Sequence, residues 1–179
     1  MVEHEAATWM DRLSIAISRV AMFLIAWIVA IMFFEVVMRY VFEKPTLWVN
    51  EMSLWTAGAV YLLSGLYVMQ QRGHIRIFIL YDMVSRNWQR AFDTISTLLI
   101  CLFAAGVVWG GFNEARDKLL RWETFGTAWD PPIPATMKPL VLLIVVLIAV
   151  QAVVNLISDW NKEKQVHDLA EEVMQEHVD

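Results

Sequence analysis

The chain has 179 residues, of which 58% are hydrophobic and 18% charged, and its formal net charge at pH 7 is −5. Soluble domains carry less apolar sequence and about 25% charged residues, so this composition excludes an ordinary soluble globular protein. The single cysteine excludes a disulfide framework and a thiolate metal cluster, and the acidic balance gives no sign of a nucleic-acid partner.

Four apolar stretches follow one another along the chain, at about 20–41, 48–69, 95–112 and 138–158. Each is close to the ~20 residues that a helix needs to cross a bilayer. We therefore predict an all-α membrane protein with a four-helix transmembrane domain over residues 20–158 and short amphipathic interfacial helices beside it.

Residues 1–19 precede the first span and are predicted to form an amphipathic arm, because Trp9, Leu13 and Ile17 recur at four-residue steps. Acidic residues stand where a signal peptide has its basic start, so we predict no cleavable signal peptide.

A polar junction separates the first two spans. Glu35 and Arg39 lie one helical turn apart and can pair, with three open roles: a contact to a partner subunit, a self-satisfied pair at the lipid headgroups, or part of an ion path. Pro45 and Thr46 are expected to start and cap the second helix, which places Trp48 and Glu51 in its opening turn. These last two residues either contact a partner or serve the interface belt and the helix dipole.

A basic loop follows the second span. Residues 75–92 show helical periodicity with arginines on the polar face, which predicts a helix lying in the membrane interface. The basic residues assigned to this loop, as lipid headgroup anchors or with an equally open specific role, are Arg72, His74, Arg76, Arg86 and Arg90.

The third helix is expected to run past the membrane into a second outer segment, where residues 129–134 are too rich in proline to be helical. In the fourth span, Gln151 and Asn155 share a face and are expected to form inter-helix hydrogen bonds. Residues 159–179 form an acidic tail. Charges on the outer segment, either binding-protein contacts or solvated helix surface, are Glu114, Arg116, Asp117 and Arg121.

An even number of spans places both termini on one side. Of the 14 Lys and Arg residues, the terminal side carries eight and the other side six, and the loop after the second span holds four arginines. The positive-inside rule therefore predicts that both termini are cytoplasmic.

Several chemistries have no candidate residues. All four histidines lie outside the apolar stretches, which argues against a haem site within the membrane. The sequence has no glycine-rich phosphate loop, no metal-ligand spacing and no Ser/His/Asp set, so we predict neither an enzyme nor a bound cofactor.

The motifs at the span boundaries resemble those of the small transmembrane subunit of TRAP transporters (tripartite ATP-independent periplasmic transporters, the DctQ-like family). The resemblance covers nearly the whole chain. It rests on Arg39-Tyr40-Val41-Phe42, then Pro45, Trp48 and Glu51, and finally Gly73-His74-Ile75-Arg76. Asn50 departs from it, because the family has an acidic pair at the start of the second span and Asn50 takes its first position.

The resemblance implies a scaffold subunit in a bacterial inner membrane. Its partners would be a large multi-span permease subunit and a periplasmic substrate-binding protein that delivers an organic acid, which enters with sodium. The small subunit would brace and widen the permease and add to the docking surface. The outer segment at 129–139 is similar to the TRAP branch associated with 2-oxo acids and related monocarboxylates. The two candidates for the transported acid are therefore a 2-oxo acid and a dicarboxylate.

Two other functions are compatible with a small four-span protein. One is a self-contained four-helix membrane sensor or assembly factor, in which Glu35 and Arg39 pair within a single bundle. The other is a membrane redox anchor, which would need histidines as axial haem ligands within the spans.

Overall fold

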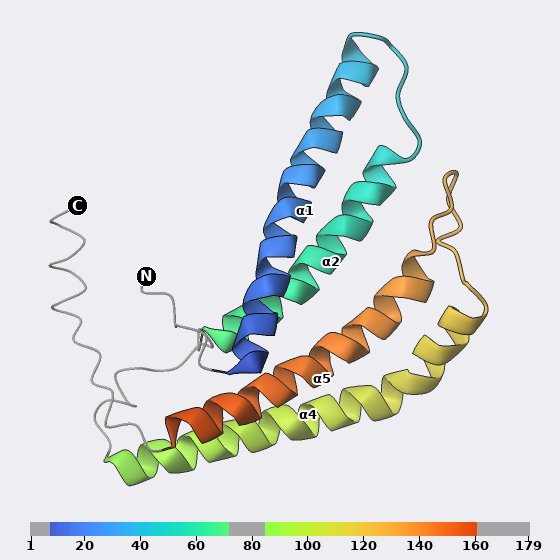
Figure 1. The fold of residues 1–179 in the computed structure, drawn as a ribbon. Helices are drawn as coiled ribbons and strands as arrows, with labels where there is room; N and C mark the ends of the chain where they lie inside the picture. The colour runs from blue at the N-terminus through green and yellow to red at the C-terminus, as the bar shows by residue number, and fades with distance from the viewer. Residues whose placement is uncertain (1–7, 72–84, 161–179) are drawn as a thin grey trace, which may run out of the picture.

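The computed structural model describes residues 8–71 and 85–160, which form four long helices and contain no strand. They are α1 (Trp9–Tyr40), α2 (Val49–Gln70), α4 (Arg86–Leu120) and α5 (Ile133–Asp159) (Figure 1). All four are long and apolar enough to cross a membrane. The predicted class, an all-α membrane protein with four spans, is confirmed.

α1 begins with a capping box. The Asp11 amide donates to Thr8 Oγ1 at 3.2 Å, and the Thr8 amide donates to Asp11 Oδ2 at 2.9 Å. This reciprocal pair satisfies backbone donors that a helix start otherwise leaves open. From there α1 continues to Tyr40 without a break, so residues 9–19 of the predicted arm are the first turns of the first membrane helix.

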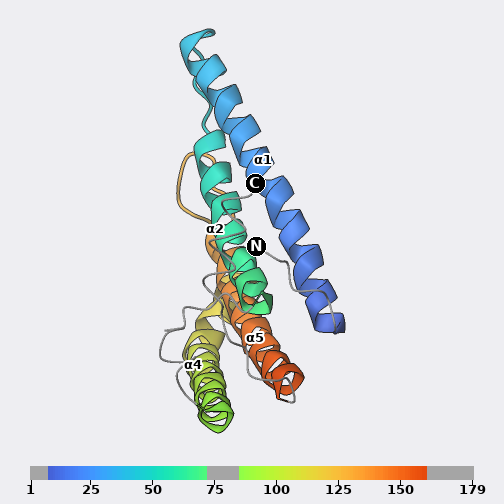
Figure 2. The same ribbon diagram turned by 90° about the vertical axis from the view of Figure 1, so that its left-hand side faces the viewer.

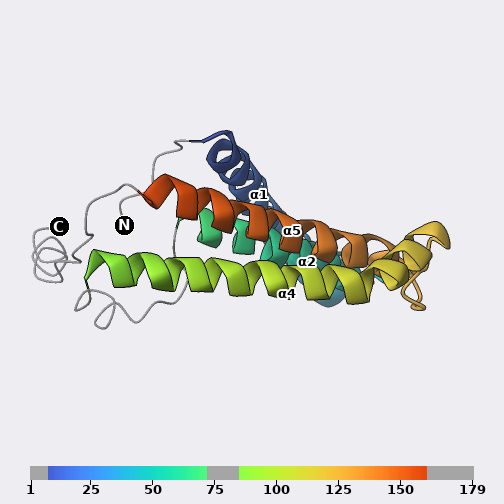
Figure 3. The ribbon, with the colours of Figure 1, turned by 90° about the horizontal axis from the view of Figure 1, so that it is seen from below.

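The helices form two hairpins that are inclined to one another (Figure 1). α1 packs on α2, α4 packs on α5, and the contact between α2 and α5 joins the hairpins. The spatial order is therefore α1, α2, α5, α4, and α4 and α5 run side by side along most of their length (Figure 3). This order is an open row of helices, in contrast to a closed bundle around a central core.

The seam between α2 and α5 is closed by small residues and by hydrogen bonds near both ends. Trp55 Nε1 donates to Thr136 Oγ1 at 2.9 Å near the starts of α2 and α5, and Asn155 Nδ2 donates to the Met69 carbonyl at 2.7 Å near the ends of these helices. Between them, a Cβ on Gly58 would come within 3.4 Å of a methionine sulfur on α5, so the two helices approach closely there.

A buried polar cluster ties α1 to α5 at the inner end. Gln151 Nε2 donates to Asp11 Oδ1 at 2.8 Å and to Asn155 Oδ1 at 3.0 Å, while Ser14 Oγ donates to Gln151 Oε1 at 3.2 Å. Ser14 and Gln151 are fully buried. The predicted inter-helix hydrogen bonds of Gln151 and Asn155 are confirmed, whereas the part played by Asp11 and Ser14 was not predicted.

Many of the large apolar side chains of the spans are exposed. Figure 2 shows α1 and α4 lying apart from one another. In the most apolar stretch of α4 only 6% of the residues are buried, against 22% in α5. α4 therefore lies at an edge of the row, and its apolar side chains need lipid or another protein as a neighbour.

Two helix starts differ from the sequence predictions. α2 begins at Val49, with Trp48 at the N-cap position and no side-chain cap, so Thr46 does not cap it. α5 begins at Ile133, so the prediction that residues 129–134 are all non-helical is wrong at its end. Pro134 is tolerated because the first helical turn needs no backbone donor.

Three predicted segments extend beyond the described residues. The interfacial helix predicted at 75–92 is described only from residue 85, and its residues 86–92 are the first turns of α4. The tail predicted at 159–179 is described only to residue 160, and the arm predicted at 1–19 only from residue 8.

Candidate functional site

The end of α1, the start of α2 and the connection between them, residues 35–51, form a polar junction that we call the rim. Past the last helical residue, the Lys44 amide donates to the Met38 carbonyl at 2.9 Å, and Glu43 takes a positive φ of 53°. A left-handed conformation is uncommon for a residue with a Cβ and reverses the chain sharply. The connection therefore folds back over the end of α1 and brings Thr46 to Glu35.

Glu35 is the centre of this rim. Its Oε1 accepts from Arg39 Nη2 at 2.6 Å and from Arg39 Nε at 3.2 Å, and its Oε2 accepts from the Thr46 amide at 3.0 Å and from the Thr46 hydroxyl. Only 9% of the Glu35 side chain is exposed. A buried carboxylate is tolerated when donors saturate it, and here both oxygens are bonded within the chain.

Arg39 completes the ion pair from the surface. Its side chain is 51% exposed, so one edge of the guanidinium is bonded to Glu35 while the rest faces outward. An arginine carries five N–H donors, and Glu35 accepts from only two of the nitrogens. Within the described residues the remaining donors of Arg39 have no partner, so they can bind another group.

Trp48 joins the two hairpins at the rim. Its ring centroid lies 6.3 Å from that of Phe34 on α1 and 6.4 Å from that of Trp129 in the α4–α5 connection, and both ring pairs are tilted. Tilted aromatic pairs at this separation are attractive. Trp48 therefore has a packing role within the chain, which was not predicted; its two predicted roles, a partner contact and a place in the interface belt, stay predictions.

Glu51 lies in the first turn of α2, as expected, where the helix dipole favours a carboxylate. Its Oε2 is buried and accepts no hydrogen bond from the described part of the chain. A buried polar atom without a partner costs about 1–3 kcal/mol, so such an atom in a native chain calls for a donor from elsewhere.

The outer end of α4 carries two ion pairs: Lys138 donates to Glu114, and Lys118 donates to Glu123. Three further charged residues there are exposed, namely Arg116, Asp117 and Arg121. Of the four predicted docking residues, Glu114 is thus bonded to Lys138 of α5, and the other three are exposed at the C-terminal end of α4.

The basic residues of the inner loop are only partly described. Arg72, His74 and Arg76 lie outside the described residues. Arg86 and Arg90 lie on the first turns of α4, where Arg86 Nη2 donates to the Asp159 carbonyl at 2.6 Å and the Arg90 guanidinium lies over the Trp160 ring. Both arginines therefore pack against the end of α5.

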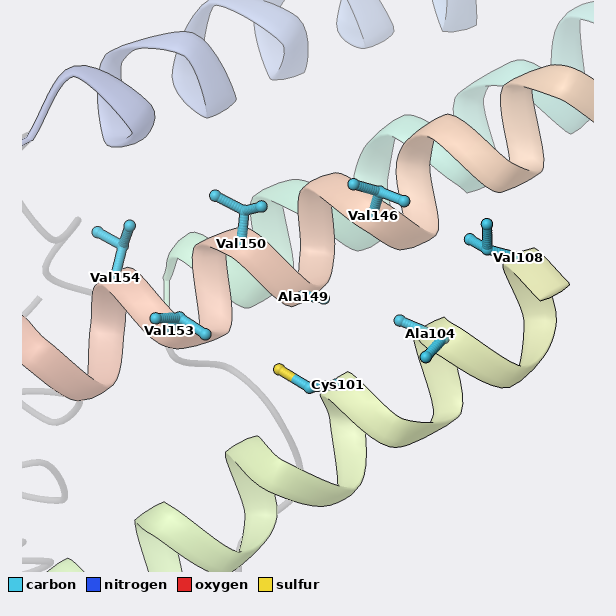
Figure 4. Close-up of a pocket in the computed structure, with 9 residues that line it drawn as sticks. Cys101, Ala104, Val108, Val146, Ala149, Val150, Val153 and Val154 are labelled. Carbon is cyan, nitrogen blue, oxygen red and sulfur yellow. The ribbon is translucent and has the colours of Figure 1, made fainter.

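A groove of about 450 Å³ runs between α4 and α5 in the middle of the spans. Cys101, Ala104 and Val108 line it on the side of α4 that faces α5, and the α5 wall is built from valine and alanine (Figure 4). Such a lining offers no strong hydrogen-bond donor or cation, so the groove is unsuited to a carboxylate or a metal ion. Within the described residues, no group of His, Cys, Asp and Glu side chains is arranged to hold a metal.

Comparison with known proteins decides the family. The sequence pattern described as "Tripartite ATP-independent periplasmic transporters, DctQ component" matches residues 28–162. The chain belongs to the DctQ family. The match runs from the middle of α1 past the end of α5 and so includes the rim and all four helices. Neither the search of curated proteins nor that of solved structures finds a match.

Membership of the DctQ family makes this chain the small component of a TRAP transporter, which works with a large permease subunit and a binding protein. The resemblance predicted from the sequence is confirmed. The four long apolar helices fit a multi-pass membrane protein of a transport system.

Sequence reasoning missed two residues that build the DctQ rim. Thr46 was expected to cap α2 but bonds Glu35, which lies 11 residues earlier. Trp129 was placed in an extended segment with no partner and packs on Trp48 from the other hairpin. No local spacing signals either contact, because each depends on how the connections fold back over the helix ends.

Proposed function

We propose that this DctQ component is the scaffold subunit of a sodium-coupled TRAP transporter that imports an organic acid. It lies in a bacterial inner membrane with both termini in the cytoplasm and braces the large permease subunit. The carried acid is a carboxylate of the 2-oxo acid or dicarboxylate kind, delivered by a periplasmic binding protein.

The open row of helices carries this proposal. A protein that works alone in the membrane gains most by packing its four helices around one another. Here the helices at the two edges of the row have one neighbour along most of their length: α1 packs on α2, and α4 packs on α5. The groove in the middle of the described spans is lined by apolar side chains and a cysteine, and within the described residues no group of His, Cys, Asp and Glu side chains is arranged to hold a metal ion. A long apolar face beside an apolar groove suits a brace better than a carrier.

The rim supplies the polar contacts of the brace. Within the described residues, Glu51 has a buried oxygen that lacks a donor, and Arg39 at the end of α1 is bonded only to Glu35. We assign the partner contact to these two residues and to Trp48, which packs on Phe34 of α1. Glu35 acts as the internal acceptor that holds Arg39 in place, and its saturation by Arg39 and Thr46 disfavours a role in an ion path.

The exposed outer charges fit a different contact. Arg116, Asp117 and Arg121, together with the Glu114–Lys138 pair, lie on the outer end of α4, the side on which a periplasmic binding protein would approach. Exposed charges at the edge of a protein contact act mainly on the rate and orientation of docking.

Reconstitution tests the proposed function. Vesicles that contain the permease, this chain and the binding protein should take up a labelled organic acid when a sodium gradient is imposed, and vesicles that lack any one of the three should not. Uptake by this chain alone would contradict the proposal. Uptake that is unaffected by omitting this chain, together with its purification as a lone, uniform species, would favour the sensor or assembly factor.

A conservative variant tests the rim. Glu51→Gln removes the charge without changing the shape, and loss of a buried charged contact costs about 2 kcal/mol or more, which is roughly 30-fold in Kd. Glu43→Gln is the matched control, because Glu43 is an exposed carboxylate of the same junction. Co-purification with the permease should fall for the first variant only; equal recovery of both complexes would remove Glu51 from the interface.

A further inference from the structure

The inner end of the α4–α5 hairpin contains an open pocket of about 510 Å³, separate from the rim and from the groove in the middle of the spans. The first three turns of α4 form one wall, and Trp160 at the end of α5 closes the other side. The lining residues are Asn87, Arg90, Ala91, Thr94, Ile95 and Trp160.

Arg90 is held in this pocket with its donors unused. Its guanidinium carbon lies 5.7 Å from the centroid of the Trp160 ring, within cation–π range, so the ring fixes the charged group at the pocket wall. Its Nε is buried, and within the described residues the guanidinium makes no hydrogen bond or ion pair. A fixed guanidinium with free donors is a good receptor for the oxygens of a phosphate group.

Further polar groups surround that charge. Asn87 adds an exposed amide at the mouth, and Arg86 adds a second positive charge one turn away from Arg90, fixed by its bond to the Asp159 carbonyl. Two carboxylates, Asp93 and Asp159, lie on the neighbouring turns, and both already take part in interactions of their own.

The α4 wall of the pocket also has an apolar part, which continues toward the middle of the span. Ala91 and Ile95 lie one turn apart, and the same face of α4 continues through Leu98 and Leu102, which are both exposed. A ligand that fits the whole site therefore has an anionic head and an apolar tail. A free phosphate ion would use only the polar mouth.

We propose that this pocket binds the phosphate group of a membrane phospholipid, with an acyl chain lying along α4. Arg90 holds the phosphate oxygens, Trp160 keeps Arg90 in place, and Asn87 contacts the headgroup. This inference does not depend on the transport function, because it rests only on the α4–α5 hairpin.

Native mass spectrometry of the full chain, purified in detergent and stripped of lipid, tests the proposal. Separate samples receive phosphatidylglycerol, diacylglycerol with the same acyl chains, or inorganic phosphate, and the adduct masses show which of them the protein retains. We expect retention of phosphatidylglycerol only, and about tenfold weaker binding in Arg90→Gln, the factor for losing one hydrogen bond between charged groups.

Arg116→Gln is the matched control, since it removes an exposed arginine from the opposite end of the same helix and should leave binding unchanged. If circular dichroism shows that Arg90→Gln is misfolded, Asn87→Leu replaces it, because Asn87 is exposed and its loss leaves the helix packing intact. Equal phosphatidylglycerol binding by Arg90→Gln and the wild type, or equal retention of diacylglycerol, would overturn the proposal. Retention of inorganic phosphate without lipid would assign the pocket to a free anion and overturn it as well.

Discussion

Replacing Gln151 by leucine should separate α1 from α5. The substitution keeps the size of the side chain but removes three hydrogen bonds, those with Ser14, Asp11 and Asn155. Two of these bonds cross to α1, whereas the bond with Asn155 lies within α5 itself. Inter-helix hydrogen bonds in membrane proteins contribute about 0.6 kcal/mol each on average, so the loss between α1 and α5 amounts to about 1.2 kcal/mol. That free energy corresponds to roughly an eightfold change in the unfolding equilibrium constant.

The assay is equilibrium unfolding in mixed micelles of increasing sodium dodecyl sulfate content, followed by tryptophan fluorescence. Two serine-to-alanine variants on α1 provide the controls. Ser14→Ala removes one bond to Gln151 and should cost about 0.6 kcal/mol, whereas Ser18 bonds the Ile15 carbonyl of its own helix, so Ser18→Ala should cost little. A Gln151→Leu protein as stable as the wild type, or equal stability of the two serine variants, would refute the reasoning.

Two further predictions concern the contact between α4 and α5 and the rim. A Cβ on Gly111 would lie 3.0 Å from a leucine methyl of α5, whereas nothing lies within 4 Å of one on Gly110; Gly111→Val should therefore lower the unfolding free energy by about 1–3 kcal/mol relative to Gly110→Val in the same micelles. Thr46→Val removes a hydroxyl donor from Glu35 and should cost about 1 kcal/mol. Thr56→Val, which loses only a bond within its own helix, should cost less, and the reverse order would contradict the assigned role of Thr46.

The sequence predicts those parts of the fold that depend on periodicity and on local spacing. The four apolar stretches locate the four helices, and the four-residue spacing of Glu35 and Arg39 predicts their pair, which forms at 2.6 Å. The shared face of Gln151 and Asn155 likewise predicts their inter-helix bonds. In each case the helix alone fixes the relation between the residues.

The remaining contacts depend on tertiary geometry. Gln151 bonds Asp11 and Ser14 on α1, which lie 140 and 137 residues earlier, and no local spacing in the sequence signals these contacts. Glu43 takes a left-handed conformation that sequences usually reserve for glycine, so the turn that carries Thr46 to Glu35 had no local signal. Burial of one Glu51 oxygen depends on the packing around it and is likewise invisible in the sequence.

The order in which the polar groups enter the membrane follows from the seam between the hairpins. α1 and α2 are neighbours in sequence and pair with each other, so they can insert and associate before α4 and α5 have been synthesised. Gln151 and Asn155 lie on α5, which is synthesised after the other three helices. Their hydrogen-bond partners, Asp11, Ser14 and the Met69 carbonyl, belong to the first hairpin and are already in the bilayer. Two amides that would be costly to leave unpaired in hydrocarbon thus make docking of the second hairpin the final step of assembly and fix its register against the first.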